Sequence, residues 1–129
     1  MFKDKWLLLV EDDKDIQDSL IELLDMEGYS VQGVSDGAQA LEALRAAEQP
    51  PALILLDLMM RGMSGPQFLE EQRKDADLQR IPVVIMSADG TGQSRISEND
   101  VDGFLRKPAD IVDILSLVER YLGPPPANG

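Results

Sequence analysis

The sequence contains no cysteine and no histidine in its 129 residues. The lack of cysteine excludes disulfide bonds, zinc–thiolate sites and thiol nucleophiles. The lack of histidine excludes Ser–His catalytic pairs and imidazole metal ligands. Basic residues are also few, because 12 Lys plus Arg stand against 24 Asp plus Glu, which gives a net charge of −12. A surface of that charge repels nucleic acid and anionic lipid, so we expect the chain to bind neither directly.

Long hydrophobic runs are absent as well. A membrane-spanning helix needs about 18 or more consecutive apolar residues, and the first apolar run, Trp6–Val10, is far shorter. The acidic residues Glu11–Asp13 follow it at once, which a signal-peptide core does not allow. Hydrophobic residues make up 43% of the chain, enough for the core of one domain. We therefore expect one cytoplasmic domain over residues 1–122 and a proline-rich tail or linker stub over residues 123–129.

Short apolar runs alternate with helical patterns along the chain. Five runs are nearly continuous in apolar character, as in parallel strands that helices cover on both faces: Trp6–Val10, Val31–Val34, Leu53–Leu56, Pro82–Met86 and Gly103–Leu105. Repeated strand–helix units predict a doubly wound α/β fold, because each parallel return needs a right-handed crossover. Five strands favour the flavodoxin-like order 2-1-3-4-5, with five helices.

The helices are predicted from apolar residues spaced three and four positions apart. The stripes expected to be buried are Ile16, Leu20, Leu23 and Leu24; Leu41 and Leu44; Phe68 and Leu69; and Ile111, Ile114, Leu115, Val118 and Leu122. Asp13, Asp36 and Asp110 are suited to N-caps, and Gln39 completes a pattern that resembles a capping box. The fourth of the five helices is expected at Thr91–Asn99, where a single isoleucine is available for burial, so we expect it to be short or mobile.

Polar residues follow the predicted strands at their carboxyl ends, where ligands bind in an open α/β sheet. Glu11 and Asp12 follow the first run, Asp57 the third, Ser87 the fourth and Lys107 the fifth. The first and third strands are neighbours in the order 2-1-3-4-5. We therefore expect Asp12 and Asp57 to converge, although they are far apart in the sequence.

Carboxylates that converge on one crevice repel one another unless a cation lies between them. Oxygen ligands without histidine or cysteine favour a hard ion. Mg²⁺ suits them because it binds a few carboxylates, retains waters and pairs with phosphate. Lys107 would add a compact positive charge for a phosphoryl oxygen. A carboxylate beside Mg²⁺ and a lysine is an environment in which Asp57 can become an aspartyl phosphate.

Four short motifs occur in order along the chain. They are Leu7-Leu8-Leu9-Val10-Glu11-Asp12-Asp13, then Leu55-Leu56-Asp57-Leu58-Met59-Met60 with Gly65 following, then Met86-Ser87-Ala88, and finally Phe104-Leu105-Arg106-Lys107-Pro108. In this combination the chain resembles the receiver domain of two-component response regulators, from Lys5 to Leu122. Each motif alone is common, but the four together are specific.

The resemblance implies roles for the acidic positions. Asp57 resembles the phosphoacceptor. Glu11 and Asp12 resemble the acidic pair that binds Mg²⁺, with the backbone carbonyl of Met59 as a further ligand. This alignment leaves Asp13 as a helix N-cap.

The other matches imply phosphoryl contact and switching. Lys107 resembles the lysine that contacts the phosphoryl group, Ser87 the switch hydroxyl and Phe104 the switch aromatic. Two positions depart from the family pattern. Arg61 stands where a proline is common, which alters the loop or places a cation near the site. The stretch from Ser87 to Lys107 is slightly short and poor in helix formers, which puts the fourth helix and the usual signalling surface in question.

The resemblance implies a phosphorylation-dependent signalling switch rather than a conventional enzyme. A sensor histidine kinase or a histidine phosphotransfer protein would supply the phosphoryl group, since the chain has no histidine of its own. The domain would catalyse transfer onto Asp57 and later hydrolysis of the acyl phosphate, with Mg²⁺ bound. The downstream partner would be an output protein, a fused output domain or a second phosphorylated copy of the chain.

Two other interpretations stay open at this point. A pseudo-receiver would use the same fold as a constitutive protein-interaction module, which Arg61 and the weak fourth helix allow. An enzyme on the same scaffold is disfavoured by three features. Met59 stands where a haloacid-dehalogenase-like phosphatase has its second acid, Glu11–Asp13 would repel the phosphate of a flavodoxin cofactor, and no P-loop motif is present.

Overall fold

The computed structural model describes residues 5–57, 65–87, 102–106 and 111–124. Five parallel strands form one sheet in the order β2-β1-β3-β4-β5, which confirms the predicted topology. The strands are β1 (Leu7–Val10), β2 (Val31–Val34), β3 (Leu53–Asp57), β4 (Val83–Ser87) and β5 (Gly103–Arg106). Each begins and ends within one residue of its predicted run.

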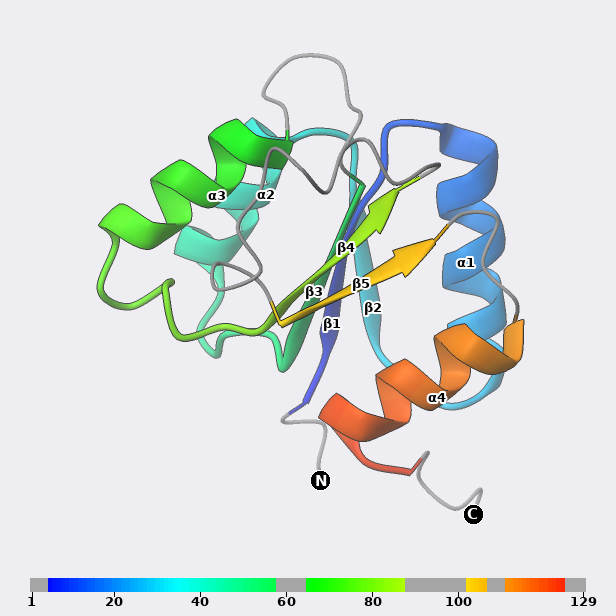
Figure 1. Cartoon of the computed structure of the whole chain (residues 1–129). Helices are drawn as coiled ribbons and strands as arrows, with labels where there is room; N and C mark the ends of the chain where they lie inside the picture. The colour runs from blue at the N-terminus through cyan, green and yellow to red at the C-terminus, as the bar shows by residue number, and fades with distance from the viewer. Residues whose placement is uncertain (1–4, 58–64, 88–101, 107–110, 125–129) are drawn as a thin grey trace.

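Helices cover both faces of this sheet (Figure 1). They are α1 (Lys14–Met26), α2 (Gly37–Ala46), α3 (Gly65–Lys74) and α4 (Ile111–Leu122). The pair α1 and α4 lies on one face, and the pair α2 and α3 on the other. α4 is the last of the predicted helices. The helix predicted at Thr91–Asn99, and Asp110 as an N-cap, lie outside the described residues.

Two apolar layers hold the sheet between the helix pairs. The layer toward α2 and α3 includes Leu8, Val10, Ile54, Leu56, Leu41, Leu44 and Phe68. The layer toward α1 and α4 includes Leu7, Leu9, Leu53, Leu55, Leu24, Ile114 and Val118. Every residue of β1 and β3 is buried, as expected for central strands covered on both faces. Burial of each large side chain stabilises the fold by about 1.5–3 kcal/mol, so the ends of these two strands are firmly placed.

The prediction of burial is wrong for two residues of the predicted stripes. Ile16 is 39% exposed and Ile111 is 55% exposed. A helical side chain covers the turn N-terminal to its own Cα, and Ile111, as the first residue of α4, has no such turn to cover. In α1 the buried positions are Gln17 and Leu24, which turns Ile16 toward solvent.

The start of α2 confirms Asp36 as an N-cap. Its carboxylate accepts a hydrogen bond from the backbone N–H of Gln39 at 2.8 Å. The reciprocal bond differs from that of a standard capping box, because the Gln39 side-chain oxygen accepts from the N–H of Ser35 rather than from Asp36. The Asp36 and Gln39 side chains therefore each accept a backbone N–H at the start of α2.

Candidate functional site

Three consecutive acids follow β1, and their surroundings differ. Glu11 is buried, with 1% of its surface exposed, whereas Asp12 is half-buried and Asp13 is exposed. The Asp13 carboxylate accepts hydrogen bonds from the backbone N–H groups of Asp15 at 3.0 Å and Ile16 at 3.2 Å. Asp13 is therefore the N-cap of α1, as predicted.

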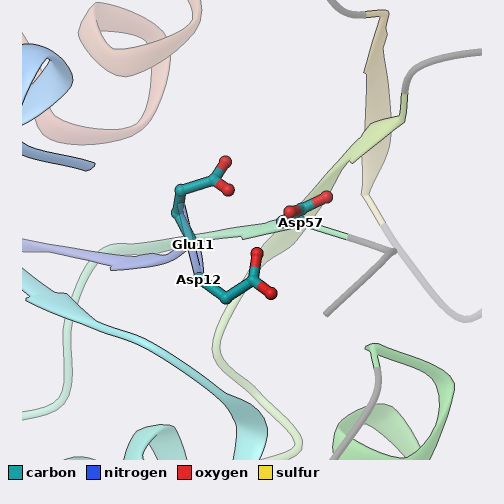
Figure 2. Close-up of side chains that lie close together, drawn as sticks. All are labelled: Glu11, Asp12 and Asp57. Atoms are coloured by element: carbon teal, nitrogen blue, oxygen red, sulfur yellow. The ribbon is translucent and has the colours of Figure 1, made fainter. Parts of the chain in front are cut away.

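A third buried or half-buried carboxylate comes from Asp57, the last residue of β3, which is 5% exposed. β1 and β3 are paired with Val10 beside Leu56, so the residues after both lie at the same edge of the sheet. One oxygen from each of the Glu11, Asp12 and Asp57 carboxylates lies within 4.8 Å of the other two. Figure 2 shows these three side chains gathered where β1 and β3 end. The structure thus brings together the three acids that the sequence places at this edge.

The three carboxylates of this acidic cluster (Glu11, Asp12 and Asp57) repel one another when they are charged. Two unit charges 4 Å apart repel by about 1 kcal/mol in bulk water and by about 4 kcal/mol at the effective dielectric near a protein surface. The N–H of Asp13 donates a hydrogen bond to Oε2 of Glu11 at 3.2 Å, which stabilises one of these charges. A divalent cation between the carboxylates would replace repulsion by attraction. The donor set fits a hard cation such as Mg²⁺, because it consists of carboxylate oxygens at binding separation.

The backbone positions of two further predicted residues lie on neighbouring strands. Ser87 is the last residue of β4 and Phe104 lies in β5. Asp57 pairs with Met86, the residue before Ser87, so Ser87 ends the strand next to the acidic cluster. β5 ends at Arg106. Lys107, Met59 and Arg61 lie outside the described residues, so their predicted roles stay predictions.

One polar residue beside the cluster was missed. Gln17 is 4% exposed, and its Nε2 donates to the carbonyl oxygens of Glu11 at 2.9 Å and Val34 at 2.8 Å. The sequence does carry a signal for its burial. Positions 17, 20, 21 and 24 follow the spacing i, i+3, i+4, i+7 of a buried helix face, and only the polarity of glutamine argues against it.

In the described part of the chain, none of the helices combines the length and the apolar character that a bilayer crossing requires.

Comparison with known proteins identifies relatives over most of the chain. The family model described as the response regulator receiver domain matches residues 7–119. The chain is 34% identical over 119 residues to the response regulator Rre1 of Synechocystis sp., covering 90% of this chain and 51% of that protein. The chain spans about half the length of Rre1 and of the next two curated relatives that it matches.

Solved structures with the same fold include proteins that hold magnesium. The receiver domain of sensor histidine kinase PA1611 from Pseudomonas aeruginosa PAO1, with a magnesium ion coordinated in its active-site cleft, has a TM-score of 0.81 and 25% identity, covering 92% of this chain and 98% of that one. The response regulator protein TrrA from Thermotoga maritima, in complex with Mg²⁺-BeF, has a TM-score of 0.79 and 26% identity, covering 92% of this chain and 99% of that one.

Proposed function

The chain belongs to the response regulator receiver domain family, and from that membership we propose that Asp57 is phosphorylated by a partner protein to switch a signalling surface. The observation that carries this proposal is the acidic cluster, whose carboxylate oxygens lie within 4.8 Å of one another. Burying a carboxylate costs free energy, which hydrogen bonds, ion pairs or a bound metal ion offset. Asp57 is 5% exposed and lies beside two other acids, so a bound cation would stabilise it there.

Mg²⁺ would be held by the carboxylates of Glu11, Asp12 and Asp57, with the carbonyl of Met59 as a further ligand. The binding of magnesium by the PA1611 receiver domain supports this assignment. When bound, the cation neutralises charge on the transferring phosphoryl group. Lys107 would contact a phosphoryl oxygen from the end of β5.

The transfer is a displacement at phosphorus. An oxygen of the Asp57 carboxylate attacks the phosphorus of a phosphohistidine, the phosphorus–nitrogen bond breaks, and the histidine nitrogen keeps the electron pair and takes up a proton. An acyl phosphate forms on Asp57. Attack of water on the same phosphorus later releases inorganic phosphate and restores the carboxylate, which resets the switch.

The donor would be a sensor histidine kinase or a histidine phosphotransfer protein, which places the reaction in the cytoplasm, where the kinase draws on ATP. Phosphorylation would draw the Ser87 hydroxyl inward and repack Phe104, which changes the surface near β4, β5 and α4. That surface would bind an output protein, a fused output domain or a second phosphorylated copy. Residues 1–122 form the receiver in this proposal, and residues 123–129 the tail or linker.

The test is chemical phosphorylation of the purified protein. Incubation with Mg²⁺ and a small acyl-phosphate donor should add one phosphoryl group, detected by intact-protein mass spectrometry. Asp57→Asn should abolish the gain, because an amide cannot form the acyl phosphate. Asp13→Asn is the matched control, since Asp13 caps α1, and this variant should still be phosphorylated. Addition of EDTA should suppress the reaction in the wild type.

Failure of the wild type to gain mass with any small donor or histidine kinase would overturn the proposal. A folded protein of that behaviour would be a pseudo-receiver, which acts as a constitutive interaction module. A mass gain that persists in Asp57→Asn would instead assign the phosphoryl group to another residue.

A further inference from the structure

Gln17 joins the end of β1 to the end of β2 through its side-chain amide. Its Nε2 donates to the Glu11 carbonyl at 2.9 Å and to the Val34 carbonyl at 2.8 Å. The Val34 carbonyl also accepts the backbone N–H of Glu11 at 3.0 Å. Gln17 is 4% exposed, so water has little access to these bonds. One side chain of α1 therefore binds the backbone carbonyl just after β1 and the last backbone carbonyl of β2.

The Glu11 carbonyl belongs to the peptide unit that links Glu11 to Asp12. The direction of this carbonyl reports the backbone torsion ψ of Glu11, and a change in that torsion turns the Asp12 side chain relative to the Glu11 side chain. The amide of Gln17 thus holds the backbone torsion that sets the direction of the Asp12 side chain relative to that of Glu11.

The space for Gln17 comes from a glycine on β2. A Cβ atom built on Gly33 would lie 2.9 Å from Cδ and 3.0 Å from Cγ of Gln17, and 2.6 Å from Cδ1 of Ile21. Such distances force a neighbour to move. Gly33 lies in the strand interior, where glycine is unfavourable by about 0.5–1 kcal/mol relative to alanine. Close approach of the Ile21 and Gln17 side chains is the reason that the structure gives for a glycine there.

From this geometry we propose that Gln17, accommodated by Gly33, is a positioning residue for the acidic cluster. It touches neither the cation nor the phosphoryl group. It acts through the Glu11 peptide unit, and it holds Glu11 and Asp12 in the orientation in which their carboxylates face Asp57. The proposal rests on the proposed function in so far as the cluster binds Mg²⁺.

The chain offers a matched control for the purely structural effect of losing a buried glutamine. Gln72 is 3% exposed, and its Nε2 donates to the carbonyls of Leu78 at 2.8 Å and Ile81 at 3.1 Å. Those carbonyls precede β4, away from the carboxyl ends of the strands. Gln17 and Gln72 therefore make the same kinds of bonds at similar burial, and only Gln17 is bonded to the backbone of a clustered acid.

The experiment compares Gln17→Met, Gln72→Met and Gly33→Ala with the wild type, each as the full chain. Methionine keeps the volume of the side chain and removes the amide donor. Mg²⁺ affinity is measured by isothermal titration calorimetry with MgCl₂. Loss of groups that orient metal ligands typically weakens metal binding about 10- to 100-fold, and we expect Gln17→Met at the low end, about tenfold. Gly33→Ala should weaken binding in the same direction, and Gln72→Met should bind as the wild type does.

A metal-free measurement keeps the two proposals separable. Amide hydrogen exchange followed by NMR reports the N–H of Glu11, bonded to Val34, and the N–H of Asp13, bonded to Glu11. Both should exchange faster in Gln17→Met than in Gln72→Met at equal global stability. If the wild type binds Mg²⁺ and Gln17→Met binds equally well, or Gln72→Met weakens binding as much, the positioning role is wrong. If the wild type does not bind Mg²⁺, the proposed function fails, and unchanged exchange at these two amides would then overturn the positioning role as well.

Discussion

At the level of single residues, Glu11 and Asp57 are the acids that are buried in the part of the chain that the structure describes, 1% and 5% exposed. Buried charges persist in folded proteins when they are hydrogen-bonded, paired or bound to a metal ion. In the part of the chain that the structure describes, the other buried polar residues, Gln17 and Gln72, are uncharged. Over the described ranges, no buried side-chain nitrogen or oxygen lacks a hydrogen-bond partner. The concentration of buried charge at one edge of the sheet is therefore a local feature of the acidic cluster rather than a general property of the core.

Asp12 and Asp13 are neighbours in the sequence, but Asp12 belongs to the acidic cluster and Asp13 caps α1. Asp13→Ala should lower the free energy of unfolding by about 1 kcal/mol, because two N–H groups at the start of α1 lose their acceptor. Its Mg²⁺ affinity should stay close to that of the wild type. Asp12→Ala should behave in the opposite way, with metal affinity reduced at least about tenfold and unchanged or higher stability in metal-free buffer, since one repelling charge is gone.

Urea unfolding followed by Trp6 fluorescence measures the stabilities, since Trp6 packs against the core, and calorimetric titration with MgCl₂ measures the affinities. Equal losses of affinity in the two variants would show that Asp12 has no special role in metal binding.

Between elements, the contact that joins α1, β2 and α4 is made by Tyr29. This residue lies in the turn between α1 and β2, and its ring is buried in the layer toward α1 and α4. Its hydroxyl donates to the carbonyl of Gly123, just after α4, at 3.0 Å. Burial, with the nearby charges of Glu119 and Glu27, raises the pKa of Tyr29 above its usual value of 10.0. Ionisation of the Tyr29 phenol would remove the hydrogen bond to Gly123. It would also place a negative charge in a buried site near two glutamates.

The pH dependence of this contact gives the prediction for Tyr29→Phe. At neutral pH the variant should be less stable by about 1 kcal/mol, the value of one hydrogen bond. The folded-state pKa is raised, so this contribution is complete below pH 10 and is lost as the pH rises through the folded-state pKa. The stability difference between wild type and variant should therefore shrink above pH 10. Urea unfolding at a series of pH values from 7 to 11, in roughly equal steps, measures it; a difference that stays constant would contradict the raised pKa.

For the whole molecule, the net negative charge lowers the stability of the folded state. A net charge of −12 on 129 residues destabilises the compact state through self-repulsion, and salt screens that repulsion. The sheet order adds a local component, because it sets β1 beside β3 and so brings Asp57 to Glu11 and Asp12, from which it is far apart in the sequence. Monovalent salt screens the charge of the whole surface, whereas a bound divalent cation acts on this one cluster.

Thermal unfolding in NaCl and in MgCl₂ at matched ionic strength separates the two effects. Both salts should raise the melting temperature of the wild type, and MgCl₂ should raise it further, because a ligand that binds only the folded state stabilises it. In Asp57→Asn the additional effect of MgCl₂ should largely disappear, while the effect of NaCl should remain. An equal additional effect in wild type and variant would place the stabilising Mg²⁺ elsewhere on the protein.

The sheet order and the meeting of Glu11, Asp12 and Asp57 could be predicted from the amino-acid pattern alone. Both follow from local patterns: continuous apolar runs require a covered parallel sheet, and residues after neighbouring parallel strands share an edge. Asp13 and Asp36 were also predictable as caps, since capping depends on a few adjacent backbone groups.

The choice between the two helical spacings that the sequence allows for the buried side of α1, one with Ile16 and one with Gln17, depends on the packed fold. Ile16 is the more hydrophobic residue, yet Gln17 is buried and Ile16 is 39% exposed. The rotation of a helix about its axis depends on the surface that it packs against. Here that surface has a gap at Gly33 and two carbonyl oxygens, of Glu11 and Val34, within reach of an amide. A glutamine that satisfies both carbonyls fits this surface better than an isoleucine, and no pattern along the sequence records the shape of that gap.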